Sequence, residues 1–114
     1  GQYQQAIGYF TEALRYKPGF ADAWYNMGVS YGKLGRYQQA IGYYREALRI
    51  RPDYAEAWNN LGVSCDKLGQ YQQAIGYFTE ALRYKPDYAE ARNNLVVVNG
   101  KLGPFRSGTD RSRW

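Results

Sequence analysis

The sequence predicts an all-α protein in which six helices stack as antiparallel pairs. This prediction rests on two observations. A segment recurs along the chain, and within each copy the apolar residues have the spacing that places them on one face of a helix. Residues 1–9 return at 35–43 with one substitution and at 69–77 unchanged, so the period is 34 residues both times. Residues 1–34 and 69–102 agree at their first 18 positions and at seven of the other 16. Duplication of one helical unit explains both observations.

The first helix is expected at about residues 2–16, and its second copy shows the pattern most clearly. There apolar residues follow Tyr37 at steps of three, four, seven, ten and eleven, as on one face of a helix. These residues are Ala40, Ile41, Tyr44, Ala47 and Leu48. This copy is expected to end at Arg51-Pro52, because proline lacks the backbone N–H and disfavours helix in the residue before it.

A second helix follows each proline, and the sequence supplies both a start and a stop signal for it. Asp53 can cap the free amides at the helix start while Glu56 reaches back, a capping box that residues 87–90 repeat. One face of this helix carries Trp58, Leu61, Gly62 and Cys65. The helix is expected to stop at Gly69, because glycine readily adopts the left-handed conformation past a helix end. The last copy is expected at about residues 88–102.

Packing accounts for most residues of the repeat. Trp24 and Trp58 are expected to fill the space between paired helices, while Gly28 and Gly62 let backbones approach closely. Cys65 occupies the position of a core tyrosine and is expected to be a small buried side chain. Three further glycines lie in mid-helix with no packing reason in the sequence: Gly8, Gly42 and Gly76.

The repeat divides the chain into five parts. These are a partial repeat at 1–18, full repeats at 19–52 and 53–86, a partial repeat at 87–103, and an expected flexible tail at 104–114. The last repeat departs from the others, because Arg92 replaces the tryptophan, Val96 the glycine and Asn99 the tyrosine.

This pattern resembles the tetratricopeptide repeat (TPR), which reads W-x2-L-G-x2-Y, then A-x3-F, then P over 34 residues. The matching residues are Trp24, Met27, Gly28, Tyr31, Ala40, Tyr44 and Pro52, then Trp58, Leu61, Gly62, Cys65, Ala74, Phe78 and Pro86. The resemblance covers residues 1–103. It implies a right-handed superhelical array of helix pairs that acts in protein–protein interaction, with a concave groove lined by the first helix of each repeat.

Within that groove, Asn26, Asn60 and Asn94 recur at one place on successive helices. A side-chain amide both donates and accepts, so it pairs with peptide backbone of any sequence, and the resemblance implies an extended peptide as the ligand. The expected groove residues are Tyr25, Asn26, Lys33, Asn59, Asn60, Lys67, Asn93, Asn94 and Lys101. The alternative is that these residues are polar only to keep the groove solvated.

A second binding mode of the family is disfavoured. Members that grip a C-terminal carboxylate carry Lys and Asn, then Asn, then Lys and Arg at five groove positions. This chain has Tyr25, Val29, Asn60, Glu90 and Asn94 at those positions. Only Asn60 matches, and Glu90 reverses a required charge.

Composition excludes several classes of function. The chain has 114 residues, one cysteine, no histidine and a formal net charge of +5. Catalysis by Ser-His-Asp or Cys-His, a thiol cluster for zinc and an internal disulfide are therefore ruled out. No phosphate-loop, HExxH, CxxC or GxSxG motif is present. We expect no enzyme activity, no cofactor and no metal.

Partners and location follow from similar arguments. The sequence has no run of about 18 apolar residues and no signal peptide, so we expect a cytoplasmic protein without a membrane partner. Its positive charges are scattered, which predicts no specific nucleic-acid binding. A protein or peptide is the expected partner.

Two alternatives to groove binding remain open. In the first, copies of the chain assemble through open terminal helices. The front face would consist of Ala6, Ile7, Phe10, Ala13 and Leu14, and the back face of Leu95, Val96, Val98 and Leu102. In the second, the chain is a fragment that recruits partners to a larger enzyme, because it begins inside a repeat.

Overall fold

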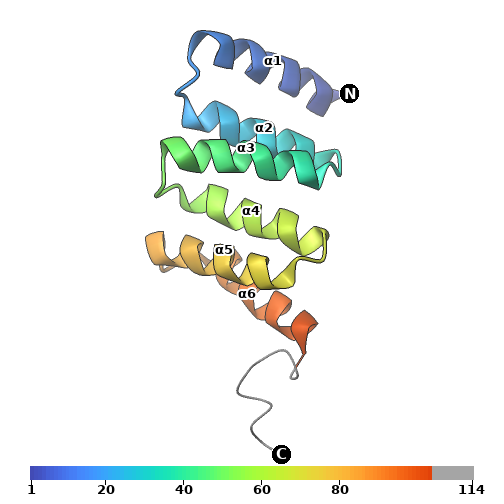
Figure 1. Ribbon diagram of the computed structural model, residues 1–114, viewed down its shortest axis with the longest axis vertical. Coiled ribbons are helices and arrows are strands. Elements are labelled where there is room, and N and C mark those ends of the chain that lie inside the picture. The colour runs from blue at the N-terminus through green and yellow to red at the C-terminus, as the bar shows by residue number, and fades with distance from the viewer. Residues whose placement is uncertain (104–114) are drawn as a thin grey trace, which may run out of the picture.

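The structure is a computed structural model that describes residues 1–103, and these residues form six α-helices without a strand. The helices are α1 (Gln2–Tyr16), α2 (Ala21–Lys33), α3 (Tyr37–Ile50), α4 (Ala55–Lys67), α5 (Tyr71–Tyr84) and α6 (Ala89–Leu102). Figure 1 shows them following one another down a single stack. The predicted all-α architecture is confirmed, and the two terminal helices match their predicted ranges within one residue. The predicted tail at 104–114 lies outside the described residues.

Each helix packs mainly on its neighbours in the chain, as the repeat requires. The helix α2 also contacts α4, and α4 contacts α6, so these three helices lie side by side along the stack. They are the first helices of their repeats, which places the expected groove residues on adjacent elements.

Two glycines allow the paired helices to approach. A Cβ atom on Gly28 would lie 2.5 Å from the ring of Tyr44, and one on Gly62 would lie 2.6 Å from the ring of Phe78. Any larger side chain at either position would push the helices apart, because real Cβ contacts are not this short. The predicted role of both glycines in close packing is confirmed.

Trp24 and Trp58 contact both the loop before their helix and the helix after it. Their helices, α2 and α4, are called groove helices together with α6, because they carry the expected groove residues. The indole N–H of Trp24 donates to the Pro18 carbonyl at 2.8 Å, and that of Trp58 donates to the Pro52 carbonyl at 2.8 Å. Trp24 also stacks on Tyr43 of α3, with ring centroids 5.9 Å apart. Each half-buried indole thus has its polar group satisfied while its ring fills space between helices.

The predicted glycine stop at Gly69 is confirmed, and two other glycines end helices in the same way. Gly35, Gly69 and Gly103 have φ angles of 77°, 78° and 73°, in the left-handed region. Past Gly69, the Gln70 N–H donates back to the Cys65 carbonyl at 2.8 Å, which closes the end of α4.

The predicted capping boxes are wrong. The N-cap residues of α4 and α6 are Tyr54 and Tyr88, one residue after the expected aspartates, and neither makes a side-chain cap bond. The Tyr54 N–H donates to the Arg51 carbonyl at 3.2 Å, so a turn occupies the place of the cap. Asp53 consequently stays exposed, and Glu56 lies 3.4 Å from Lys85 instead of reaching back to the cap.

Candidate functional site

A cavity of about 340 Å³ lies between α2 and α4. Its walls come from α2, α3 and α4, and the lining residues are Val29, Gly32, Lys33, Tyr37, Tyr44, Asn60, Val63, Ser64 and Lys67. Lys33, Asn60 and Lys67 belong to the expected groove set. The cavity therefore combines apolar walls with an amide and two ammonium groups.

An aromatic cluster beside the cavity holds the three helices together. The ring of Tyr25 lies 4.9 Å from that of Tyr54 and 5.9 Å from that of Tyr44. Asn60 donates from Nδ2 to the Tyr25 hydroxyl at 3.0 Å. Burial, followed by the Glu56 charge, raises the pKa of Tyr25, and burial raises that of Tyr44. Both phenols therefore stay neutral over the physiological range.

The expected groove residue Asn59 does not reach the groove. Its side chain is 0% exposed, donates from Nδ2 to Glu90 at 3.2 Å and accepts from Asn94 at 3.0 Å. It thus binds α4 to α6, and assigning it to a ligand-binding role is incorrect. The reason is its direction, since it points at the next groove helix and its neighbour Asn60 points toward α2.

The three recurring asparagines present different atoms. Asn26, Asn60 and Asn94 are all half-buried on successive groove helices. Asn60 and Asn94 use an amide N–H for a bond to the neighbouring repeat, to Tyr25 and Asn59 respectively. Among residues 1–103, Asn26 and the exposed Asn93 have no side-chain partner. Both the N–H groups and the oxygen of the Asn26 amide are therefore available to a ligand.

The lysines at the ends of the groove helices also differ. The Nζ atom of Lys101 lies 2.8 and 3.0 Å from the two Asp66 oxygens. Lys33 and Lys67 are exposed and form no ion pair with any residue that the structure describes.

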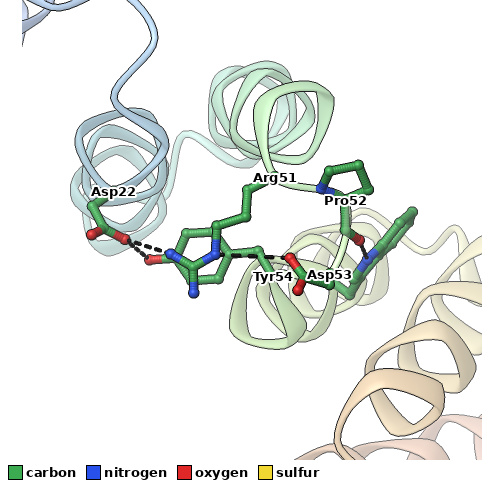
Figure 2. A network of polar contacts seen from close by, with 6 residues as sticks. Asp22, Arg51, Pro52, Asp53 and Tyr54 are labelled. Carbon is green, nitrogen blue, oxygen red and sulfur yellow. Dashed lines mark hydrogen bonds and ion pairs between the residues drawn. The ribbon is translucent and has the colours of Figure 1, made fainter.

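At the opposite ends of these helices, Asp22 and Glu56 are each paired with the cation that precedes the proline of the same repeat. Figure 2 shows Asp22 accepting from the Tyr54 hydroxyl at 2.7 Å and from Arg51 at 3.4 Å. The Arg51 guanidinium lies 4.0 Å above the Tyr54 ring centroid, a cation–π contact that sequence reasoning missed. The next repeat reproduces the ion pair with Lys85 and Glu56, 3.4 Å apart. A cation before each proline, 29 residues after an acid of the same repeat, was the available signal.

Comparison with known families settles the relationship that these repeats suggest. A family model described as tetratricopeptide repeat matches residues 19–87, and a second, described as TPR repeat, matches residues 1–35. The chain belongs to the tetratricopeptide repeat family. Among curated proteins, none matches this TPR chain.

Solved TPR domains share the fold. The first TPR of Spaghetti (RPAP3), bound to the HSP90 peptide SRMEEVD, is similar with a TM-score of 0.87 and 22% identity, over 90% of this chain and 81% of that one. The second TPR domain of human RPAP3, in complex with the HSP70 peptide SGPTIEEVD, has a TM-score of 0.83 and 23% identity, over 87% and 82%. The Arabidopsis OM64 TPR domain has a TM-score of 0.84 and 23% identity, over 87% and 82%.

Other kinds of site receive no support in this TPR domain. Residues 1–103 contain no group of three or more His, Cys, Asp or Glu placed to hold a metal ion. No helix in the same range is long and apolar enough to cross a membrane. Cys65 is 1% exposed, and burial raises the pKa of its thiol, which confirms its predicted place in the core.

Proposed function

We propose that this TPR domain is a protein-interaction module that binds an extended peptide in the groove along α2, α4 and α6. The observation that carries the proposal is the cavity between α2 and α4, where apolar walls meet polar groups from both groove helices. An apolar side chain that fills such a cavity contributes about 1.5–3 kcal/mol before association costs.

Asn26 supplies the second element of the proposal. Its amide has no partner within residues 1–103, so it is free to pair with the backbone of a bound peptide. Asn60 and Asn94 already hold the repeats together, so the part of the asparagine ladder available to a ligand is centred on α2.

The proposal is tested by selecting nine-residue peptides from a displayed library on the full chain and measuring their affinity by fluorescence anisotropy. We expect Asn26→Ala to weaken the selected peptides about two- to tenfold, the value of one hydrogen bond. Val29→Glu with Val63→Glu should abolish binding by placing charges on the apolar walls. Asn99→Ala, the same kind of change at an exposed α6 position outside the expected groove set, serves as the control. The proposal is wrong if the double-glutamate variant, folded by circular dichroism, selects peptides as well as the unchanged chain.

The carboxylate-gripping mode seen as disfavoured in the sequence remains so in our proposal. Tyr25 and Val29 stand where that mode needs Lys and Asn, and Glu90 accepts a bond from Asn59. We therefore propose that the peptide is held through internal residues and not through its C-terminal carboxylate. Catalysis is not part of the proposed function, and recruitment to a larger enzyme remains a prediction.

Self-assembly through the terminal helices is the second candidate, and the 66% exposed side chain of Val96 favours it. Two residues of the expected faces do not fit it, because Val98 and Leu14 are 0% and 9% exposed and belong to the core. One contact opposes the simplest arrangement, in which α1 of a second copy packs on α6 as the next helix of the array. Phe10 of α1 corresponds to Phe78 of α5, which packs against Gly62, whereas α6 has Val96 at the equivalent position. The α1 helix of a second copy therefore cannot pack on α6 as α5 packs on α4. Light scattering over a hundredfold concentration range, with Val96→Glu plus Leu102→Glu as control, tests this candidate.

A further inference from the structure

The groove helices carry acids at one end and lysines at the other, and the two ends are neutralised unequally. The acid at the start and the lysine at the end are Asp22 and Lys33 on α2, Glu56 and Lys67 on α4, and Glu90 and Lys101 on α6. At the acidic end, Arg51 and Lys85 pair with the first two acids. At the lysine end, Lys101 alone has a carboxylate partner among residues 1–103.

A single substitution between repeats explains this difference. Asp66 on α4 reaches Lys101, which lies 35 residues further along the chain. The residue that lies 35 positions before Lys67 is Gly32, which has no side chain. Lys67 consequently receives no counter-charge from α2.

The two lysines without a partner face the same space. Lys33, Lys67 and Gly32 all line the cavity between α2 and α4, together with Val29 and Val63. No lining residue carries a carboxylate. Asp66, the nearest acid in sequence to Lys67, is held by Lys101 on the far side of α4. The cavity therefore combines apolar walls with net positive charge.

We propose, on the basis of the proposed function, that this cavity selects an extended peptide with an internal acidic side chain. An apolar side chain of the peptide fills the space between Val29 and Val63, and an Asp or Glu two residues away places its carboxylate at Lys33 and Lys67. Residues i and i+2 of an extended chain point to the same side, about 6.6 Å apart, so one short segment reaches both groups. The partner is thus an acidic segment within a protein chain.

Gly32→Asp tests the proposal directly, because it places at position 32 the acid that the next repeat already has at Asp66. A Cβ atom on Gly32 meets only the Tyr44 hydroxyl at 3.9 Å, an ordinary contact, so the helix accommodates the change. Gly32→Asn is the matched control, since it adds the same volume without the charge. Peptides selected from the nine-residue library on the unchanged chain are then synthesised with capped ends, with each Asp or Glu replaced by Asn or Gln in a second set.

We expect the unchanged chain and Gly32→Asn to bind the acidic peptides about two- to tenfold more tightly than their amides at low salt, and Gly32→Asp to lose this preference. Raising the ionic strength should reduce the difference, because these charges are exposed. If acidic and amide peptides bind equally while Asn26→Ala still weakens both, acid selection is wrong and groove binding stands. If no peptide is enriched over the Val29→Glu, Val63→Glu variant, both proposals fail.

Discussion

The Tyr54 hydroxyl donates a hydrogen bond of 2.7 Å to the Asp22 carboxylate, which joins two successive repeats on the groove side. The same Asp22 accepts from Arg51, whose guanidinium lies over the Tyr54 ring. Three residues from two repeats thus form one contact network (Figure 2). In a linear array, such contacts contribute to the coupling between neighbouring repeats.

Tyr54→Phe should lower the free energy of unfolding by about 1–2 kcal/mol, because Asp22 loses a charge-assisted hydrogen bond while the ring packing is kept. Urea denaturation measures the change. Tyr9→Phe is the control, since Tyr9 is 80% exposed and should be neutral. Equal losses in both variants would show that the Asp22 contact adds no stability.

Stability should fall in alkaline solution. Burial, with the charges of Glu90 and Glu56, raises the pKa of Tyr88 to about 12 from the ordinary value of 10. Its raised pKa means that the folded chain holds the phenol proton more tightly than the unfolded chain does. The contribution is therefore complete below pH 10 and is lost as the pH rises to about 12. Denaturation at pH 9 and at pH 11.5 should show this loss, and Tyr88→Phe should reduce it. If the free energy of unfolding falls between these two pH values by the same amount in Tyr88→Phe, the assignment to Tyr88 is contradicted.

Gly42→Ala should stabilise the fold by about 0.8–1 kcal/mol, because Gly42 lies in mid-helix with no atom within 4 Å of an added Cβ. Nothing in the structure requires glycine at this position. Gly62→Ala should instead destabilise, since its Cβ would lie 2.6 Å from Phe78. Thermal unfolding of both variants distinguishes helix propensity from packing. A midpoint that falls in Gly42→Ala would mean that this glycine has a role that the fold does not show.

The peptide SRMEEVD, present in the RPAP3 structure, allows a test of whether the C-terminal carboxylate of a peptide contributes to its affinity for this chain. We expect amidation of its C-terminus to leave the affinity of this chain for the peptide unchanged, whatever that affinity is, because Tyr25 and Val29 offer no charge to a terminal carboxylate. Calorimetry on the two forms measures the difference. A tenfold loss on amidation would restore the carboxylate-gripping mode.

Restoring the repeat pattern in α6 should create an association surface. Arg92→Trp, Val96→Gly and Asn99→Cys reproduce the face that α4 presents to α5. Phe10 of a second copy then finds a glycine, as Phe78 finds Gly62. We expect the apparent mass by light scattering to rise with concentration more steeply than in the unchanged chain. Keeping Val96 while changing the other two residues is the control. Equal association with Val96 in place would show that the glycine contact is irrelevant.

Much of the fold follows from the repeat alone. The helix ranges, the left-handed Gly69 and the close packing at Gly62 were predictable, because helix periodicity, turn chemistry and the repeat itself recur within 34 residues. The predicted cap at Asp53 failed, because a turn at Arg51 shifted the helix start by one residue, and the sequence contains no local signal for that shift.

The candidate site depended on contacts between repeats. Asn59 and Asn60 are adjacent and chemically identical, so only the rotation of α4 between its neighbours decides that Asn59 is buried against α6 while Asn60 faces α2. Lys67 and Lys101 also share one position in the repeat but differ in their charge environment. Asp66 lies 35 residues before Lys101 and pairs with it, whereas the residue 35 positions before Lys67 is Gly32, which has no side chain. Burial and ion pairing are properties of the space between helices, and that space exists only once the repeats have stacked.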